Sequence, residues 1–454
     1  MPACDIEFSH SWRKTNLGDV AEFVMGQAPP GNASNFQAVG TVFVKAGEFG
    51  VTHPIIREWT TKPLKLARSG DVLICVVGAT AGKLNLGIDC AIGRSVAAIR
   101  PSNEILDRFL YLQLQPKVSE LRAASMGSAQ GVINKQMLAN IEVVVPPFDE
   151  QREIVAETEK QFTRLEAGVA GLRRVQANLK RYRAAILKAA CEGKLVATEA
   201  DLARQEGRSY ETGAQLLERI LTERRENWSG KGTYKEPARP ETNRLPKLPE
   251  GWMWATAEQV NLADRPCAYG VLQPGEDLDE GVPFVRVGDI NNGRVEIEDL
   301  KRISPTIAAQ YPRTKLSGGE FAITLVGAIG RTAIIPKMLA GGNVARAVGI
   351  IPLTESINAH WIEIWFRNPL KIAEMVSKSH EVARKTLNLE DVRAATIPIP
   401  PSAEQERIVA EVERRLSVVE ELEAVVNANV QRATRLRQSI LQRSFEGKLA
   451  SRCD

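Results

Sequence analysis

Several features that mark common protein classes are missing from this sequence. No apolar run reaches the roughly 18 residues that a membrane-spanning helix needs, and residues 1–14 hold no apolar core of a secretory signal. The six cysteines form no CxxC pair and the four histidines are dispersed, which argues against a zinc site and against a disulfide framework. We therefore expect a cytoplasmic protein with no membrane partner.

An excess of one charge is missing too. The chain has 59 Lys and Arg against 55 Asp and Glu, a net charge of +4 over 454 residues. This mild excess does not by itself identify a nucleic-acid-binding protein. The hydrophobic share of 44% is ordinary for folded protein. At roughly 150 residues per domain, the length corresponds to about three domains, or to two with a good deal of chain between them.

Catalytic motifs are also absent. The segment VPPF at 145–148 lacks the Asn of the Asn-Pro-Pro-aromatic loop of adenine methyltransferases, and no Gly-rich cofactor motif precedes it. The segment GATAGK at 78–83 is one residue short of a Walker A loop and is followed by Leu84 instead of Ser or Thr. We expect a non-catalytic chain with no metal site and no cofactor of its own.

The sequence does contain an internal repeat. Residues 146–195 align with residues 400–449 at a constant offset of 254, without a gap. Upstream the offset drifts from 240 to 254, so the second copy carries small insertions in one shared topology. The predicted domains are a first module over 1–145, a first helix over 146–196, a linker over 197–249, a second module over 250–399 and a second helix over 400–454.

Each repeated segment has the pattern of a long helix. Apolar residues at 3-4 spacing form a seam of about five heptads, and a helix of some 40 residues spans about 60 Å. We predict that the two helices pair antiparallel; the alternative is that each packs only on its own module. Asp149 and Ser402 are the predicted N-caps. Gly193 and Gly447 are the predicted C′ residues, and Arg183 and Arg437 take matching places on the seam. The seam consists of Val155, Phe162, Leu165, Val169, Leu172, Leu179 and Ile186, and of Val409, Val412, Leu416, Val419, Val426, Val430 and Ile440.

The two modules have the pattern of β-rich domains. Short apolar runs rich in β-branched residues end at Gly or Pro. The segments 107–124 and 359–376 each have the period of an amphipathic helix. The linker is predicted to hold one helix over 213–228, followed by an exposed stretch. The predicted strands lie in 42–46, 71–78, 95–101 and 141–147, and in 283–290, 320–327, 347–353 and 396–401.

These motifs together resemble the specificity subunits of type I restriction–modification systems over essentially the whole chain. The marks are PP-x-x-EQ-x-x-IV at the start of each helix and IL-x(4)-EGKL at its end. A third is the approach to the helix, clearest from Leu387 to Pro401; the first copy has Ile133 in place of the Leu. The linker, with LLERILTERRENW, YKEPARP and LPEGW, is also typical.

The resemblance implies an α+β fold with two β-rich target-recognition domains. Two long helices join them as an antiparallel coiled coil with a pseudo-twofold repeat. It also implies a non-catalytic protein that recognises a bipartite, asymmetric target in double-stranded DNA. The implied partners are two methylation subunits, which hold S-adenosylmethionine, and restriction subunits that use ATP and Mg. The rival interpretation is a coiled-coil scaffold that presents two protein-binding modules.

Candidate DNA contacts are basic and polar residues in the loops of the modules. Lys83 and Arg331 end Gly-rich turns suited to phosphate, although these turns can equally be tight hairpins. Arg94 and Arg346 occupy matched positions, which fits a phosphate contact or a structural ion pair. Asn134 and Asn388 recur in both copies, which favours turn-stabilising bonds. The loops 125–135 and 379–389 differ sharply between the copies and supply Ser125, Ser128, Gln130, Lys135, His380, Arg384, Lys385 and Thr386.

Basic residues also gather toward the C-terminal half of each long helix. A solvated face is one interpretation, and a docking surface for methylation subunits is the other. They are Arg173, Arg174, Lys180 and Arg181, and Arg432, Arg435 and Arg443.

Overall fold

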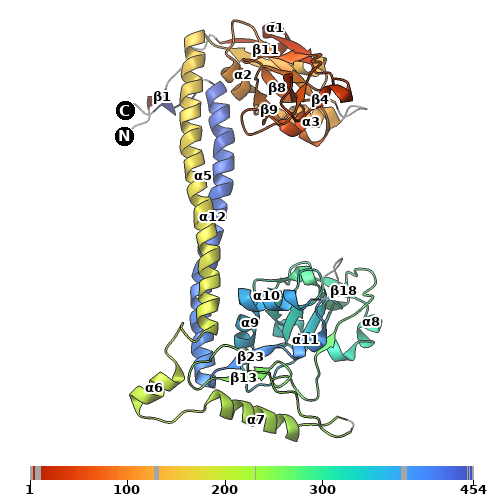
Figure 1. The fold of residues 1–454 in the computed structure, drawn as a ribbon, viewed down its shortest axis with the longest axis vertical. Coiled ribbons are helices and arrows are strands. Elements are labelled where there is room, and N and C mark those ends of the chain that lie inside the picture. Colours follow the sequence, from red (N-terminus) through yellow and green to blue (C-terminus); the bar gives the residue numbers. More distant parts are fainter. Residues whose placement is uncertain are drawn as a thin grey trace. The chain divides into compact units, whose positions relative to one another are not determined.

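A computed structural model describes residues 4–5, 12–126, 132–230, 232–379, 386–446, 448 and 450–451. The chain divides into two compact units. Unit 1 comprises residues 1–175 and 425–454, and unit 2 comprises residues 176–424. Each unit therefore contains one recognition domain and parts of both long helices (Figure 1). The domain limits proposed from the sequence stay predictions.

The recognition domain of unit 1 contains two sheets. The first is antiparallel in the order β3 (Ala21–Met25), β11 (Val96–Pro101), β8 (Val72–Cys75), β9 (Leu84–Leu86). The second has the order β4 (Ser34–Asn35), β6 (Trp59–Thr60), β5 (Thr41–Val44), β10 (Cys90–Ile92), β7 (Leu66–Ala67), with β5 and β10 parallel. Alternate residues of β8 enter two hydrophobic clusters, so this strand is buried on both faces.

The recognition domain of unit 2 repeats this topology with fewer strands. Its antiparallel sheet has the order β14 (Ala268–Tyr269), β22 (Val348–Ile351), β19 (Phe321–Thr324), β20 (Thr332–Ile334). Its second sheet has the order β18 (Lys301–Ile303), β15 (Val282–Val285), β21 (Asn343–Val344), and β15 and β21 are parallel, as β5 and β10 are. A hairpin of β16 (Ile290–Asn291) and β17 (Arg294–Val295) lies beside β20. All eight predicted strand segments contain strands.

Two further strand pairs lie next to the long helices. The strand β2 (Arg13–Asn16) pairs with β12 (Glu142–Val145), and β13 (Met253–Thr256) pairs with β23 (Thr396–Ile399). Near the termini, β1 (Cys4–Asp5) pairs antiparallel with β24 (Ala450–Ser451). The single-turn helices are α1 (Leu17–Val20), α4 (Lys135–Ala139), α8 (Pro305–Ala309) and α11 (Leu389–Arg393).

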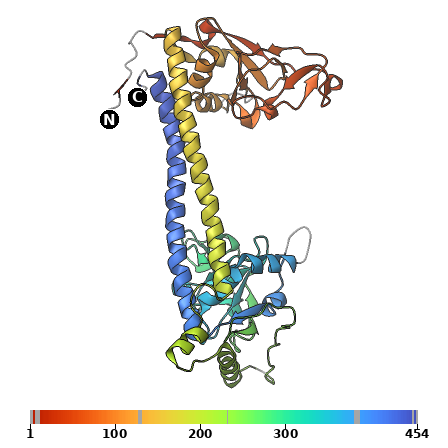
Figure 2. The ribbon, with the colours of Figure 1, turned by 60° about the vertical axis from the view of Figure 1, so that its left-hand side comes forward.

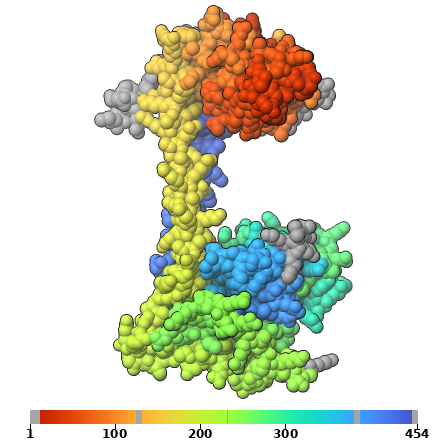
Figure 3. Space-filling view, in the orientation of Figure 1, coloured from red at the N-terminus to blue at the C-terminus, as the bar shows by residue number. Residues whose placement is uncertain are grey.

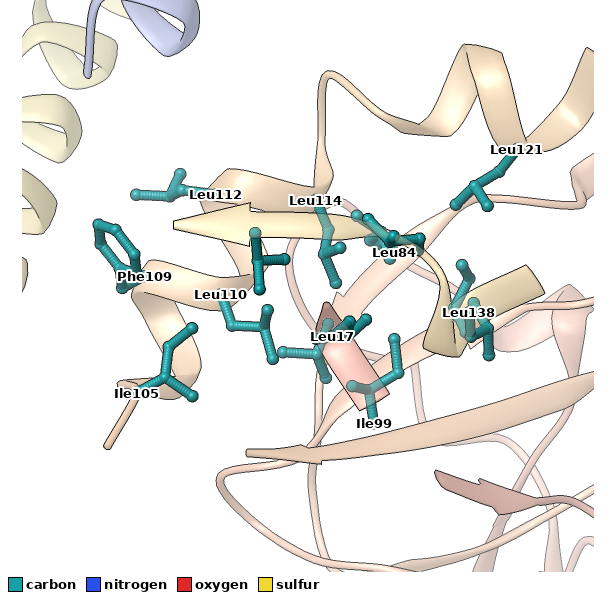
Figure 4. Close-up of a cluster of buried hydrophobic side chains, with 14 of the residues drawn as sticks. Leu17, Leu84, Ile99, Ile105, Phe109, Leu110, Leu112, Leu114, Leu121 and Leu138 are labelled. Carbon is teal, nitrogen blue, oxygen red and sulfur yellow. The ribbon is translucent and has the colours of Figure 1, made fainter. Parts of the chain in front are cut away.

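The two segments predicted as single amphipathic helices are each broken in two. The first consists of α2 (Asp107–Leu114) and α3 (Val118–Met126), with Pro116 between them. The second consists of α9 (Ala359–Arg367) and α10 (Pro369–Ser377), and Asn368 caps α10 just before Pro369. Proline lacks the N–H that a continuing helix needs, so each break follows from the sequence. Figure 4 shows α2 residues, among them Phe109 and Leu110, packed in the core of unit 1.

The long helices are α5 (Phe148–Cys191) and α12 (Ser402–Phe445), of 44 residues each. Both begin at or before their predicted N-caps, so Asp149 and Ser402 lie inside the helices and that prediction is wrong. Every residue of the predicted seam is buried or half-buried, and Figures 1 and 2 show the two helices side by side. The heptad prediction is confirmed.

The end of α5 is also as predicted. Gly193 has φ of +65°, which an αL C′ residue requires. Its N–H donates to the carbonyl of Ala190 at 3.1 Å, and the N–H of Lys194 donates to that of Ala189 at 2.8 Å, the two bonds of a Schellman motif. After α12, Lys448 N–H bonds to the Arg443 carbonyl at 3.0 Å in the same way. Gly447 itself lies outside the described residues.

Matching ion pairs join the two helices within each unit. In unit 2, Arg183 of α5 lies 3.8 Å from Glu420 and 2.8 Å from Glu423 of α12. In unit 1, Arg437 of α12 lies 3.2 Å from Glu166 of α5. Arg183 and Arg437 are 254 positions apart, and so are Glu166 and Glu420. One ion pair is thus made twice, which confirms antiparallel pairing; the helices pack on the recognition domains as well.

The linker holds one helix more than predicted. The helix α6 (Glu199–Glu206) precedes α7 (Gly213–Glu226), and only α7 was expected. The side chain of Thr198 caps the start of α6, and Gly207 ends it with φ of +65°. From 227 to 251 the described residues form neither helix nor strand, and none is buried, so this exposed stretch is as predicted. Across the described ranges, no helix is both long enough and apolar enough to cross a membrane.

Candidate nucleic-acid interface

The Glu-Gln pair that opens each long helix fastens it to the adjoining recognition domain. In unit 1, the side-chain oxygen of Gln151 accepts the N–H of Leu106 at 2.8 Å. Its amide nitrogen donates to the carbonyls of Glu104 and Pro146 at 2.8 and 2.9 Å. Glu150 accepts the indole N–H of Trp12 at 2.8 Å.

Unit 2 repeats this joint. Gln405 accepts the N–H of Asn358 at 3.0 Å and donates to the carbonyl of Pro400 at 2.9 Å. Glu404 accepts the indole N–H of Trp252 at 2.9 Å. Burial raises the pKa of Glu404, although hydrogen bonds from the Glu199 N–H and from Trp252 offset part of this effect. The sequence marked these residues as a motif without giving them a role, and the structure shows that the role is positional.

Three of the candidate segments meet at one edge of each recognition domain. In unit 1, the N–H of Val76, just before the Gly-rich turn, donates to the carbonyl of Ser95 at 2.9 Å. The carbonyl of Val76 accepts the N–H of Ile133 at 2.9 Å, and a β-bridge joins Val77 to Val132. The Gly-rich turn, the turn that holds Arg94 and the end of the divergent loop are therefore neighbours.

Unit 2 builds the same edge from the equivalent atoms. The N–H of Leu325 donates to the carbonyl of Ala347, and its carbonyl accepts the N–H of Leu387, both at 2.8 Å. A β-bridge joins Val326 to Thr386. We call this junction of three segments the recognition edge. The sequence marked these segments as separate candidates, and the structure shows that they are neighbours.

The basic residues of the Gly-rich turns are exposed but already bonded. The Lys83 ammonium donates to the Phe49 carbonyl at 2.7 Å, and the Arg331 guanidinium donates to Asn291 Oδ1 at 2.8 Å. Each group has donors left over. Gly78 and Gly82 have φ of +75° and +85°, so the glycines serve tight turns. These contacts support a structural role and leave a phosphate contact untested.

Arg94 and Arg346 are available for a further contact. Both are exposed, and the part of the chain that the structure describes offers neither guanidinium an ion pair. The alternative of a structural ion pair therefore gains no support. Lys135 is exposed at the first position of α4, whereas Thr386 is half-buried.

The divergent loops are only partly described. Asn134 caps α4 by accepting the N–H of Met137 at 2.9 Å, so its predicted turn-stabilising bond is confirmed. Asn388 takes the same position before α11 without such a bond. Ser125 lies in α3, but its side chain is outside the described part. The candidates that lie outside the described residues are Ser128, Gln130, His380, Arg384 and Lys385.

The basic residues named on the long helices are all exposed. Arg181 bonds to Asn178 at 2.7 Å within α5. Exposed apolar side chains lie on α12 as well, at positions that no sequence motif marks. Val418, Leu422 and Val425 follow a 4-3 spacing and are 50%, 45% and 52% exposed. We call these three residues the apolar row.

The described residues offer little for catalysis by metal or thiol. No group of three or more His, Cys, Asp or Glu among them is placed to hold a metal ion. The described cysteine side chains are buried and unbridged, and burial raises the pKa of the Cys191 and Cys267 thiols to about 12. Such thiols stay protonated and unreactive near neutral pH.

Comparison with known proteins identifies the family that has this architecture. The family model described as "Type I restriction modification DNA specificity domain" matches the chain twice, over residues 10–168 and 273–430. The chain belongs to this family. Each match covers most of one recognition domain and part of the long helix that follows it, so the family model occurs twice, as the repeat in the sequence does.

Individual members of the type I specificity family resemble the chain over much of its length. The EcoBI specificity subunit of Escherichia coli is 32% identical over 76% of this chain and 66% of its own length. The EcoKI specificity subunit of E. coli K12 is 24% identical over 83% of this chain and 72% of its own. A chain from a solved structure on assembly of the type I R-M system has a TM-score of 0.64 at 20% identity, over 96% of this chain and 98% of that one, and shares the fold.

Proposed function

We propose that this chain is the DNA-binding specificity subunit of a type I restriction–modification complex. Each recognition domain contacts one half of a bipartite target in double-stranded DNA. The observation that carries this proposal is the recognition edge, which both domains build from equivalent backbone bonds. One scaffold with different side chains suits two half-sites of different sequence.

The chemistry of the recognition edge fits DNA. Arg and Lys recognise guanine in the major groove or neutralise phosphates, and Ser, Thr and Gln supplement them. Arg94 and Arg346 are exposed at matching places on the edge, which fits a shared phosphate contact. The adjacent loops 125–135 and 379–389 differ at eight of their eleven aligned positions, which fits contacts to different bases.

The chemical steps belong to partner subunits in this proposal. The sequence lacks both the methyltransferase loop and a Walker A loop. Two methylation subunits supply S-adenosylmethionine and act on adenine, and restriction subunits supply ATP- and Mg-dependent steps. The apolar row on α12 supports a protein partner at the helices, because an exposed apolar strip on a helix that already has a partner suits a further helix.

The test is a domain exchange followed by sequencing of methylated bases. Cells express the chain with its methylation subunits, and we expect methylated adenines in a bipartite motif. Replacing residues 12–145 by the recognition domain of another member should change one half of the motif and leave the other half intact. A change in both halves would contradict one domain per half-site.

The scaffold alternative makes a different prediction. A scaffold with its methylation subunits has no sequence-specific DNA affinity and no steep salt dependence, whereas a DNA-binding protein loses affinity steeply as salt rises. The purified chain alone should transfer no methyl group. Methyl transfer by the isolated chain would contradict the assignment of catalysis to partners.

A further inference from the structure

Basic residues lie together on the side of the first recognition domain where the parallel strands of its second sheet end. We call this side of the sheet the basic edge. The parallel strands β5 and β10 end there, and the residues that follow them include Lys45 and Arg94. The two strand ends touch, because the Gly93 N–H donates to the Val44 carbonyl at 3.0 Å. A Cβ built on Gly93 would lie 3.2 Å from Cγ of Lys45, so Lys45 lies directly beside the turn that holds Arg94.

Two further basic residues reach the same edge from the neighbouring strands. The strands β6 and β7 run antiparallel to β5 and β10 and therefore begin where those strands end. The Phe43 N–H donates to the Glu58 carbonyl at 2.8 Å, which places Arg57 at the edge. The Ile92 N–H donates to the Lys65 carbonyl at 2.9 Å, which places Lys65 there too.

The carboxylates at this edge are already engaged. Glu58 is 6% exposed and pairs with the Lys45 ammonium. Glu48 is 9% exposed and accepts the backbone N–H of Lys45 at 2.9 Å. The remaining basic side chains are exposed, and the structure shows no ion pair for them within its described ranges. They are Arg57, Lys65 and Arg94.

Among the described residues, the equivalent edge of the second recognition domain has fewer unpaired basic side chains. Arg286 follows β15 as Lys45 follows β5, and its guanidinium lies 3.0 Å from the Asp289 carboxylate. By the strand register, Leu300 takes the place of Arg57 before β18, and Lys301, in the place of Glu58, donates its ammonium to the Gly275 carbonyl at 2.6 Å. In the described part of this domain, Arg346 is the exposed basic residue equivalent to Arg94. Within the described residues, the first domain therefore has two unpaired basic side chains more than the second at this edge, Arg57 and Lys65.

This basic edge is continuous with the recognition edge. Ser95 belongs to both, because its carbonyl accepts the Val76 N–H and its hydroxyl accepts the Ala46 N–H at 3.1 Å. Arg94 lies next to Ser95. Residues 40–70, coloured red to orange in Figure 3, contribute to the surface of this domain.

We propose that Arg57 and Lys65, which lie just before strands β6 and β7 at the same edge as Arg94, contact phosphates of the DNA backbone next to the first half-site. The inference rests on the proposed function and adds two positioning residues to it. These phosphate contacts fix the first domain on the duplex without adding sequence preference. The described part of the second domain has no basic residue in place of Arg57 or Lys65, so the two half-sites are held with different dependence on salt.

The test measures DNA affinity against salt for the full chain assembled with its methylation subunits. Each phosphate contact contributes about 0.9 to the slope of log affinity against log salt. The double variant Arg57→Ala, Lys65→Ala should therefore lower the magnitude of that slope by about two. It should weaken binding to target and non-target duplexes alike and leave the methylated motif unchanged.

Lys62→Ala is the matched control. Lys62 is exposed on the same sheet but follows β6, at the opposite edge, and it should leave the slope unchanged. Thermal melting should be the same for all variants, since the three side chains are exposed.

If the wild-type complex binds its target with a steep slope and the double variant does too, the inference fails while the proposed function stands. Loss of assembly with methylation subunits, with DNA affinity intact, would mark this edge as a protein surface and would also overturn the inference. A wild-type complex without specific DNA binding would overturn the proposed function itself.

Discussion

The carboxylate of Glu404 fastens the second long helix to two other parts of unit 2. It is fully buried and accepts the Trp252 indole N–H at 2.9 Å and the Glu199 backbone N–H at 2.8 Å. Its counterpart Glu150 is half-buried and accepts the Trp12 indole N–H. The glutamate at this motif position therefore accepts two buried hydrogen bonds in unit 2 and one half-buried hydrogen bond in unit 1.

Truncating these two residues should show that difference. Glu404→Ala leaves two buried donors without partners and should lower the free energy of unfolding by about 3 kcal/mol. Glu150→Ala removes one hydrogen bond at a half-buried position that water can reach and should cost about 1 kcal/mol. Urea denaturation followed by tryptophan fluorescence measures both, and equal costs would show that burial does not govern the joint.

The pH dependence of stability should also reveal Glu404. Its pKa is raised by burial, so the folded chain binds this proton more tightly than the unfolded chain. Stability that is present at acid pH is then lost as pH rises from the unfolded pKa through the folded one. Glu404→Gln removes the charge and keeps one of the two acceptor bonds, because its NH2 group replaces one of the two oxygens that accept them. Its unfolding free energy relative to wild type should rise from pH 4 to pH 7, and a constant difference would contradict the assignment.

At the scale of elements, the end of α5 depends on glycine for two reasons. Gly193 has φ of +65°, and a Cβ built on it would lie 2.5 Å from Pro249 Cγ. Gly207, at the end of α6, has the same φ but nothing within 4 Å of such a Cβ. Gly207→Ala should therefore cost about 1 kcal/mol from backbone strain alone, and Gly193→Ala should cost clearly more. Thermal melting compares the two, and equal shifts would show that the contact with Pro249 is unimportant.

The repeated ion pairs of the long helices should differ in strength. The Arg183 side chain is 14% exposed and faces two carboxylates, whereas that of Arg437 is 38% exposed and faces Glu166. A double-mutant cycle for Arg183 and Glu423 should give a coupling of about 1 kcal/mol, and the cycle for Arg437 and Glu166 should give less. Both couplings should shrink in 1 M salt. A larger coupling for the more exposed pair would contradict this ranking.

The range of each interaction along the chain explains which features could be predicted from the sequence and which could not. The strands and the helix seam depend on local periodicity, so their residues could be named in advance. The short helix α6 was missed because eight residues with two buried alanines carry little periodic signal. The hydrogen bonds of Gln151 and the contact of Lys83 with Phe49 depend on segments far apart in the chain, which no local pattern encodes. The basic edge had a local signal, four basic residues between 57 and 68, but its place on the sheet needed the strand register.

At the scale of the whole molecule, the gapless repeat makes the helix length a testable quantity. The repeated segments keep one offset over fifty residues, whereas the modules upstream vary. Insertions are thus absent from the segments where they would make one long helix longer than the other. This pattern is expected if the helices set the spacing between the two halves of the target.

Removing one heptad from each helix tests that expectation. Deleting 171–177 together with 425–431 removes segments 254 positions apart and keeps the seam in phase. Each helix becomes about 10 Å shorter, equivalent to about three base pairs of DNA. We expect the methylated motif to keep both half-sites with a spacer about three base pairs shorter, as measured by methylation of a DNA library with varied spacers. Deleting 171–177 alone is the control, because it shifts Arg183 against Glu423 by two turns and should abolish methylation. An active double-deletion chain with the original spacer would show that the helices do not set the distance.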